Sequence, residues 1–474
     1  MNILLISTNR CVHPVPVMPL GLCMVAEACE RAGHRVRVLD LMFEKDLFAS
    51  IGSAVVEHRP DAVGLSVRNI DNNDRADPVS YLDDLPLIVN AVRRLTGAPV
   101  ILGGAALGVM PEAILRLADV SCGVTGDGEA VVPRLLGRIG AGESLGGLPG
   151  LAFLDQERFS LTPCAGQGAA ACGAPDFHRW VNVGAYRSHL ATFPVQTKLG
   201  CAFSCVYCTY RKLEGSGYRL AEPAAVAEAV TRLVVSGARD IEFVDSVFNA
   251  PREHAVAVCE ALARTDHRAR LQSLELNPAF FDDGLVSAME RAGFVGMGIT
   301  AESASDAVLQ GLGKGFTADR VRAAAEVVRR HRIPCAWIFL LGGPGETRET
   351  VRETLRFAAA AIRRQDVAFF NVGIRIYPGT ELETIARREG VLSVPPGDML
   401  RPVFYVAPGL DGAWITHEVR KAMAGTMNFI SAGSIGLSFL PTIHRVSALL
   451  GVRPPLWKHT GLIRRGLRML GMDV

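Results

Sequence analysis

Short apolar runs alternate with longer amphipathic stretches along most of this 474-residue chain. In the first 150 residues the runs are NILLIS, VRVLDL, AVGLSV and PVILGG, followed by a weaker one at 120–124. Apolar runs of four to six residues separated by helix-like stretches are typical of a parallel sheet covered by helices. The pattern therefore predicts an α/β domain over residues 1–150, doubly wound and flavodoxin-like.

A second series of apolar runs begins near residue 191 and continues to about residue 400. Its runs are VQTKL, DIEFVD, LQSLEL, VGMGIT, CAWIFLL and FFNVGIRI, again with helix-like stretches between them. Six successive strands with intervening helices predict a partial TIM-type (β/α)6 barrel, whose chemistry lies at the carboxyl ends of the strands. Residues 151–190 are rich in Gly, Ala and Pro and are interpreted as a linker with short strands.

The last part of the chain, residues 401–474, is predicted to be a small helical region. Residues 422–443 carry no charge and are long enough to span a bilayer, but their glycines, Asn428 and Pro441 make a poor membrane helix. The following WKHTGLIRRGLRMLG is basic and amphipathic. It is read either as a peripheral membrane contact or as a small helical cap over the barrel mouth.

The charge and the cysteine content indicate the class of partner and the cellular compartment. The formal net charge of +2 gives no global field for nucleic acid, so no nucleic-acid partner is predicted. The beginning of the chain runs directly into a strand and lacks the regions of a secretory signal, so we expect a cytoplasmic enzyme. In that reducing compartment the eleven cysteines are expected to be thiols, most of them small core residues.

Three of the cysteines form a cluster after the first predicted barrel strand. Cys201, Cys205 and Cys208 lie in LGCAFSCVYCTY with C-x3-C-x2-C spacing, which lets three thiolates converge on one metal centre. A structural zinc site needs a fourth protein ligand, and the nearest histidines, His189 and His254, are distant in sequence. A [4Fe-4S] cluster with one open iron fits the spacing better.

The loop resembles a known signature. Cys201, Cys205, Tyr207 and Cys208 match the C-x3-C-x-aromatic-C pattern of the radical S-adenosylmethionine superfamily. The resemblance implies that the three cysteines hold the cluster and that the amino and carboxylate groups of S-adenosylmethionine occupy the free iron. One electron from a flavodoxin or ferredoxin then yields a 5'-deoxyadenosyl radical. Tyr207 packs either on the adenine or into the core.

Later segments extend the likeness across the barrel. This chain lacks the Gly-Gly-Glu of many members, and Asp245 and Ser246 are tentative substitutes for holding the methionine amino group. Glu275 and Glu302 lie at or just beyond strand ends, where each either accepts hydrogen bonds from the cofactor or forms a structural salt bridge. Gly342, in LLGGPGET, would let the backbone approach the adenine. That segment lacks the Lys of a phosphate-binding loop.

The first domain has no G-x-G-x-x-G after its first strand, which argues against a dinucleotide site. Its segments PVMPLGL, AGHRVRVLDL, GLSVRN, VILGGAALGVMPE and GVTGDGE, placed before such a barrel, resemble the cobalamin-binding domain of the B12-dependent branch. The D-x-H-x-x-G motif is absent, so the resemblance implies cobalamin without a lower histidine ligand.

The cobalamin-contacting residues implied by this resemblance fall at strand ends. Arg68 and Asn69, beside Ser66, would approach the lower face of the corrin. There Arg68 either holds off an axial ligand or clamps a phosphate or propionamide. The nucleotide tail would be lined by Gly103, Gly104, Gly126, Asp127, Gly128 and Glu129.

These resemblances predict a B12-dependent radical S-adenosylmethionine enzyme that methylates an unactivated carbon of a small molecule. A cyclase or rearrangement enzyme with the same cofactors is the alternative, and a cobalamin-binding sensor with a structural cluster is a remote one. The apolar stretch 429–450 and the basic tail 458–468 indicate a lipid or tetrapyrrole-like substrate, although core packing explains the same residues.

Overall fold

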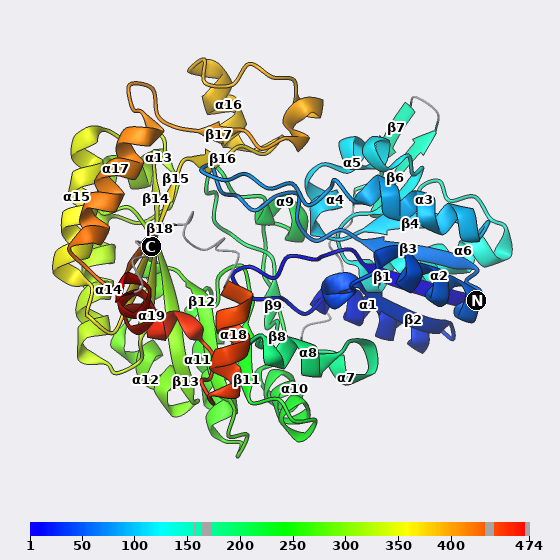
Figure 1. Ribbon diagram of the computed structural model, residues 1–474, viewed down its shortest axis with the longest axis horizontal. Helices are drawn as coiled ribbons and strands as arrows, with labels where there is room; N and C mark the ends of the chain where they lie inside the picture. The colour runs from blue at the N-terminus through cyan, green and yellow to red at the C-terminus, as the bar shows by residue number, and fades with distance from the viewer. Residues whose placement is uncertain (156–157, 164–172, 432–439, 470–474) are drawn as a thin grey trace.

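The computed structural model of the protein describes residues 1–155, 158–163, 173–431 and 440–469. Two α/β units lie side by side, with the amino-terminal unit on the right of Figure 1 and the barrel on the left. The uncharged stretch at 422–443 is only partly inside these ranges. Among the described residues, no helix is long and apolar enough to cross a membrane.

The first unit is a sheet with strand order β2-β1-β3-β4-β5-β6-β7. Its parallel strands are β1 (Asn2–Ser7), β2 (Arg35–Asp40), β3 (Ala62–Ser66), β4 (Val100–Gly103) and β5 (Cys122–Val124). The apolar faces of α1 (Leu20–Arg31) and α6 (Gly128–Ala141) belong to one hydrophobic core, and those of α2 (Leu47–His58), α3 (Leu85–Leu95) and α5 (Pro111–Ala118) to the other. The predicted doubly wound fold is thus confirmed.

Two strands continue this sheet beyond residue 150. β6 (Leu151–Asp155) pairs antiparallel with β5, and β7 (Arg158–Leu161) pairs antiparallel with β6. The short strands expected in the linker are therefore part of the first sheet. Between β7 and the barrel, α7 (Phe177–Trp180) and α8 (Val183–Ser188) are also formed.

The second unit is a seven-stranded parallel sheet with order β18-β15-β14-β13-β12-β11-β8, wound into a partial barrel. Its strands are β8 (Phe193–Val195), β11 (Asp240–Phe243), β12 (Arg270–Leu276), β13 (Phe294–Glu302), β14 (Cys335–Leu341), β15 (Val367–Val372) and β18 (Phe429–Ser431). The helices around it are α10 (Pro223–Val235), α11 (Arg252–Ala263), α12 (Asp283–Arg291), α13 (Asp306–Gly311), α14 (Ala318–Arg330) and α15 (Arg348–Ala361).

Two predicted strands are shorter than the apolar runs suggest. The run VQTKL divides, because Thr197 and Lys198 donate their backbone N–H groups to the carboxylate of Asp245. The chain then leaves the barrel sheet, and β9 (Lys198–Leu199) pairs antiparallel with β10 (Arg219–Leu220). The run FFNVGIRI divides at Gly373, after which β16 (Ile374–Arg375) pairs with β17 (Phe404–Tyr405).

The region 401–474, predicted to be small and helical, also contains a strand that the sequence analysis did not identify: β18 hydrogen-bonds to β15 and adds a seventh strand to the barrel. Its apolar residue Phe429 is buried against Phe370 of that neighbouring strand. The helices of this region are α17 (Gly412–Ala424), α18 (Leu440–Leu449) and α19 (Thr460–Met469); α16 (Glu381–Arg388) precedes them.

The basic segment at the end of the chain packs on the barrel, but not over the expected mouth. Arg464 of α19 is buried and donates to the backbone carbonyls of Thr426 and Phe429. Trp457 lies against Gly296, near the amino end of β13, and Arg270 at the start of β12 donates to the carbonyl of Pro454. The segment therefore covers the amino-terminal ends of these strands, opposite the end where barrel chemistry is expected.

Candidate functional site

The cysteine loop runs from Gly200 to Gly215 and is closed at its neck. The backbone N–H of Cys201 donates to the carbonyl of Gly215 at 3.1 Å, and that of Gly200 donates to Glu214 Oε2 at 3.1 Å. Gly200 has φ +91°, and a Cβ there would lie 1.9 Å from the carbonyl oxygen of Gly217. Only glycine fits such a position, so this residue allows the loop to close on itself.

The three thiols of the loop are free, and Cys201 is buried whereas Cys205 and Cys208 are half-buried. Burial raises the pKa of Cys208 to about 12, and the neighbouring Cys205 and Cys201 add to that rise. Among the described residues, no three His, Cys, Asp or Glu side chains already converge as ligands of a single metal ion. The chemistry of the donors nevertheless fits an iron–sulfur cluster, because three thiols lie on one loop that is closed at its neck.

Beside these thiols, three buried polar side chains form a compact network. Tyr207 donates its hydroxyl to Glu302 Oε1 at 2.7 Å, and the Lys314 ammonium donates to the same oxygen at 2.9 Å and to the Tyr207 hydroxyl at 3.2 Å. Burial alone would lower the pKa of Lys314, but the negative charge of Glu302, together with its hydrogen bond and smaller contributions from neighbouring groups, raises that pKa well above its usual value. Sequence reasoning missed Lys314, because its motif GLGKGF carries no known signature.

Glu302 has the local geometry of a functional residue. It is the last residue of β13, is 3 % exposed and has φ +60°, a region that residues other than glycine seldom adopt. The register between β13 and β14 shifts at this point. Its second oxygen, Oε2, is buried without a hydrogen-bond partner. An acceptor held this way is prepared for a donor group that the protein itself does not supply.

Asp245 and Ser246 support the cysteine loop. The Asp245 carboxylate is buried and accepts from the Thr197 backbone at 2.7 Å, the Thr197 hydroxyl at 2.7 Å and the Lys198 backbone at 3.2 Å. The Ser246 hydroxyl donates to the carbonyl of Gly200 at 3.2 Å. Both side chains are therefore engaged in positioning the strand end from which the loop departs.

Two further carboxyl groups lie at the carboxyl ends of the strands. Burial, and after it the charge of Glu302, raise the pKa of Glu275 to about 8. Glu346 accepts from the backbone N–H of Gly342 at 3.0 Å, and burial raises its pKa to about 7. Glu346 lies in LLGGPGET, where the sequence analysis singled out Gly342 alone.

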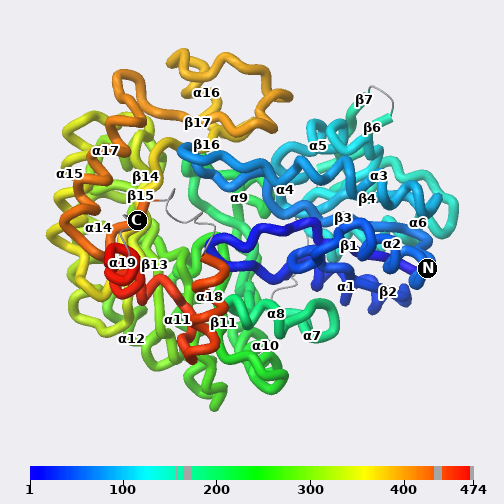
Figure 2. The backbone as a smooth tube through the Cα atoms, viewed as in Figure 1, coloured from blue at the N-terminus to red at the C-terminus, as the bar shows by residue number. Residues whose placement is uncertain are grey.

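The strand-end residues of the first unit face the barrel. Figure 2 shows the loops that follow β1 and β3 running from this unit toward the barrel. Arg68 is exposed, Asn69 beside it is half-buried, and the carbonyl of Ser66 accepts from Thr8. Burial raises the pKa of Glu242 in the barrel, and the charge of Arg68 opposes that rise. The Arg68 guanidinium therefore acts across the boundary between the two units.

Glycines near the ends of β4 and β5 allow neighbouring segments of the first unit to pack closely. Gly103 ends β4, and its neighbour Gly104 has φ +95° and a Cβ position 2.3 Å from the Val67 carbonyl oxygen. Gly126 has φ +86°. A Cβ on Gly128, the first residue of α6, would lie 2.9 Å from a methyl group of Val25. Gly104 and Gly128 are therefore required by close packing within the first unit, where a side chain would not fit.

The two acidic residues of this segment differ in their partners. Asp127 forms a bidentate ion pair with Arg219 of β10, and both side chains are largely buried. Burial raises the pKa of Glu129. Asp127 thus joins the first unit to the base of the cysteine loop, so its carboxylate is engaged with the barrel.

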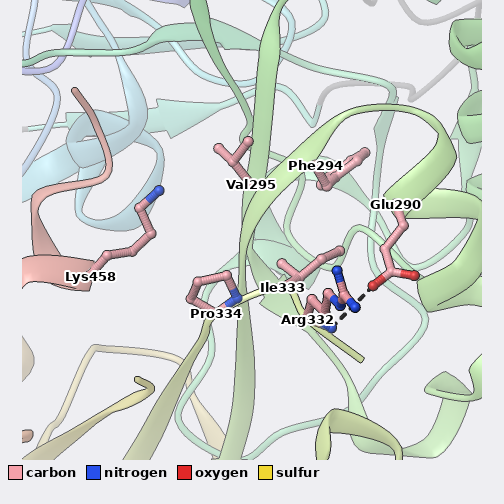
Figure 3. A pocket seen from close by; sticks show the side chains of 7 residues that line it. All are labelled: Glu290, Phe294, Val295, Arg332, Ile333, Pro334 and Lys458. Atoms are coloured by element: carbon pink, nitrogen blue, oxygen red, sulfur yellow. Dashed lines mark hydrogen bonds between the residues drawn. The ribbon is translucent and has the colours of Figure 1, made fainter. Parts of the chain in front are cut away.

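A cavity of about 320 Å³ lies elsewhere, at the amino end of the barrel (Figure 3). In it the backbone N–H of Arg332 donates to Glu290, and Lys458 approaches from the carboxyl-terminal segment. The start of β13 lines it through Phe294 and Val295. It is therefore separate from the strand ends that carry the cysteine loop and Glu302.

Comparisons with known proteins agree with both units. Residues 195–358 match the family model of the radical SAM superfamily, and residues 10–136 match that of the B12 binding domain. Tryptophan 2-C-methyltransferase of Streptomyces laurentii is 26% identical over 80% of this chain and 73% of its own length. An uncharacterized methyltransferase of Pyrococcus horikoshii is 25% identical over 77% of each chain.

Solved structures show the same arrangement of both units. The radical S-adenosylmethionine methyltransferase TsrM from Kitasatospora setae, with tryptophan and a cofactor analogue bound, has 25% identity and a TM-score of 0.85 over 99% of each chain. The cobalamin-dependent enzyme OxsB has 15% identity and a TM-score of 0.70, covering 99% of this chain and 75% of its own, which shows a shared fold.

Proposed function

This chain belongs to the cobalamin-dependent radical S-adenosylmethionine enzymes, and we propose from that premise that it methylates a carbon atom of a small molecule. The proposed target is an unactivated carbon, for which the bound cofactors would supply the radical chemistry. The predicted family, fold class and cofactors are confirmed by the two matched domains and by the relatives that share them. The cysteine loop facing the strand-end loops of the B12-binding unit carries the proposal, because it brings both cofactor sites to one place.

In the proposed mechanism, Cys201, Cys205 and Cys208 would hold the [4Fe-4S] cluster, which would supply the electron for cleavage of S-adenosylmethionine. The free Oε2 of Glu302 would accept from a ribose hydroxyl or the ammonium group of S-adenosylmethionine. The backbone at Gly342 would lie against the adenine. Together these residues orient the cofactor and exclude water from it.

In the same proposal, the B12-binding unit holds the second cofactor, cobalamin. Cobalamin, when bound, carries the methyl group, and the glycines at the ends of β4 and β5 would line its nucleotide tail. The guanidinium of Arg68 is exposed and its charge acts on Glu242 of the barrel. When cobalamin is bound, Arg68 would contact the lower face of the corrin. Because Asp127 pairs with Arg219 at the base of the cysteine loop, the two cofactor sites are held in a fixed relation.

The proposed substrate class is based on the names of two relatives. Two relatives carry names for carbon methylation, of tryptophan and of a hopanoid, and the second is 26% identical over 54% of this chain. We propose a small molecule with an apolar part, and a flavodoxin or ferredoxin as electron donor. Peripheral membrane contact stays a prediction, which the exposed Leu462 and Met469 of α19 support.

The test is anaerobic reconstitution with iron, sulfide and cobalamin, followed by separate counting of 5'-deoxyadenosine and S-adenosylhomocysteine. A panel of tryptophan, other aromatic amino acids and isoprenoid lipids provides substrates. Both products together, with a methylated substrate, support the proposal. S-adenosylhomocysteine alone would support methylation without hydrogen abstraction, and 5'-deoxyadenosine alone would favour a cyclase or rearrangement. Neither product with any substrate would contradict an enzymatic role.

A further inference from the structure

The two faces of the barrel sheet differ in how completely the chain covers them. Side chains on the outer face are buried: Phe243, Trp337 and Phe370 are at most 1% exposed, and Trp337 packs against Phe357 of α15. Side chains on the inner face, one position along each strand, are only half-buried, namely Glu242, Ile338, Leu340, Phe369 and Ile430. Side chains fill the interior of a complete (β/α)8 barrel. The inner face of this barrel therefore remains a surface that a ligand can contact.

One side of this inner face carries a carboxylate. The register pairs Glu242 of β11 with Gln272 of β12, so both side chains lie on the same face. Glu242 Oε2 accepts from the Thr192 hydroxyl at 2.8 Å and from Gln272 Nε2 at 2.8 Å. In the described parts of the chain, neither a hydrogen bond nor an ion pair engages the other oxygen, Oε1. Two neutral donors thus hold the carboxylate in position and leave one of its oxygens free.

The neighbouring acid on the same face is paired with a cation, whereas Glu242 is not. Asp240, two positions earlier in β11, forms an ion pair with Arg270 at 2.6 Å. Gln272 is 5% exposed, and its Oε1 is buried without a hydrogen-bond partner because its amide nitrogen faces the Glu242 carboxylate. Two acceptors on adjacent side chains therefore lack donors. A cationic N–H donor would satisfy both and neutralise the charge of Glu242.

The other side of the inner face is apolar. β14 contributes Ile338 and Leu340, and its neighbour β15 contributes Phe369, which is paired with Ile338. Ile430 of β18 is paired with Phe369 in turn. All four side chains are half-buried, so a ligand that covered them would remove further apolar surface from water. The inner face thus combines a free carboxylate oxygen with an apolar wall.

The carboxyl-terminal segment closes the inner face at its amino end. Gln272 is paired with Gly296 of β13, and a Cβ on Gly296 would lie 3.0 Å from the Trp457 ring and 3.2 Å from Pro455. Trp457 and Pro455 therefore occupy the place that a side chain at Gly296 would take. A ligand on the inner face enters from the carboxyl ends of the strands, where the cysteine loop lies.

We propose that the inner face of the barrel binds the substrate, and that the substrate is an amine whose ammonium group pairs with Glu242 while its apolar body covers Phe369 and the neighbouring side chains of β14 and β18. The inference rests on the proposed function and adds the chemical class of the substrate to it. An ammonium group has three donors, enough for Oε1 of Glu242 and Oε1 of Gln272. Glu242 is thus a specificity-determining residue that selects a cation over an anion.

Two probes with the same flat apolar body and opposite charges test this inference: tryptamine, which carries an ammonium group, and indole-3-propionate, which carries a carboxylate. Isothermal titration calorimetry measures their affinities for the reconstituted full-length protein with cobalamin, anaerobically and without reductant, so that neither probe is turned over. The wild type is expected to bind tryptamine more tightly. Glu242→Gln can still accept from Thr192 and Gln272, and it is expected to weaken tryptamine binding roughly tenfold or more. Its affinity for indole-3-propionate should stay unchanged or rise.

The matched control is Glu253→Gln, which removes an exposed carboxylate of α11 on the outside of the barrel. It should leave both affinities unchanged, because solvent screens its charge. Phe369→Ala is expected to weaken both probes to a similar extent, since both would use the apolar wall. S-adenosylmethionine binding should be the same in Glu242→Gln as in the wild type.

Equal affinities of the wild type and Glu242→Gln for tryptamine would overturn the inference, as would a wild type that binds neither probe. A Glu242→Gln variant that loses affinity for S-adenosylmethionine but not for tryptamine would assign Glu242 to the cofactor and also overturn it. If Glu242→Gln does not fold, the preference of the wild type between the two probes decides. A wild type that prefers tryptamine but forms neither 5'-deoxyadenosine nor S-adenosylhomocysteine with any substrate would instead contradict the proposed function.

Discussion

Arg375 of β16 donates its Nε–H to Asp71 Oδ2 at 2.7 Å, and this ion pair joins the barrel to the loop that follows β3. Both side chains are buried, with 3% and 0% of their surfaces exposed. Next to it, the Tyr377 hydroxyl donates to Asn73 at 2.8 Å. The strand-end loop of the B12-binding unit is thus anchored on the barrel, which holds Arg68 toward the space between the units.

Replacing Arg375 should weaken this anchor. Arg375→Met leaves the Asp71 carboxylate buried without its partner, so we expect the free energy of unfolding to fall by about 3–5 kcal/mol. Chemical denaturation monitored by circular dichroism measures the change. The control is Arg93→Ala, which removes an ion pair with Asp119 that is mostly exposed to solvent. In this variant the free energy of unfolding should fall by at most about 1 kcal/mol. Equal losses for both variants would contradict the structural role of the buried pair.

The cysteines of the loop can be tested by iron content. Alanine at Cys201, Cys205 or Cys208 removes one of three proposed ligands, so each variant is expected to lose most of its iron, its sulfide and the associated visible absorption. Cys259→Ala serves as the control, since this thiol is buried in α11 away from the loop. A variant of the loop that keeps the iron content of the wild type would exclude its cysteine as a ligand.

Closure of the loop depends on Gly200. In Gly200→Ala the new methyl group would meet the Gly217 carbonyl at 1.9 Å, so the neck must open. We expect a lower thermal midpoint, by several degrees, and reduced iron loading. Gly217→Ala is the matched variant, because nothing lies within 4 Å of its Cβ position. Wild-type iron loading in Gly200→Ala would show that the closed neck is not needed for cluster binding.

Glu346 should make stability depend on pH. Burial raises its pKa from the ordinary 4.5 to about 7. Between these values the folded protein binds more protons than the unfolded chain, so stability falls as the pH rises, by roughly 3 kcal/mol in total. Glu346→Gln cannot ionise, and its thermal midpoint relative to the wild type should therefore increase from pH 5 to pH 7 and then level off.

The control for this pH dependence is Glu349→Gln. Glu349 is exposed, and its hydrogen bond with Arg356 lowers its pKa. Its contribution to stability is lost as the pH falls through the folded pKa, so the wild type and Glu349→Gln should differ by a constant amount between pH 5 and pH 7. A constant difference for Glu346→Gln as well would show that the Glu346 carboxyl titrates normally.

Local patterns predicted much of the fold. Apolar runs of strand length gave both α/β units, because a strand buried on both faces must be continuously apolar. The same rule placed the ends of two barrel strands too far along the chain. The second halves of VQTKL and FFNVGIRI belong to separate two-stranded sheets, where their backbone groups pair outside the barrel. β18 was missed because a strand of three residues, Phe429–Ser431, is too short to show a period.

For the candidate site, the sequence indicated residue types and not partners. Glu302 was named from its place at a strand end, but its positive φ and its free Oε2 follow from packing. Asp245 was named as a cofactor ligand, yet its oxygens accept from Thr197 and Lys198. Lys314 lies twelve residues beyond Glu302 and more than a hundred beyond Tyr207, and no local pattern connects them.

The sequence by itself determined the chemistry available: three thiols at fixed spacing, glycines at strand ends, and two α/β units in a set order. These features are local, since they depend on neighbours within one loop or one strand. Tertiary structure decided which of the buried charges meet. It paired Asp127 with Arg219 and Asp71 with Arg375, and it placed Lys314 against Glu302 and Tyr207. The first two pairs join residues of different units, and only the packing of the two units brings them within hydrogen-bonding distance. The contacts of Lys314 depend in the same way on the packing of separate segments within the barrel.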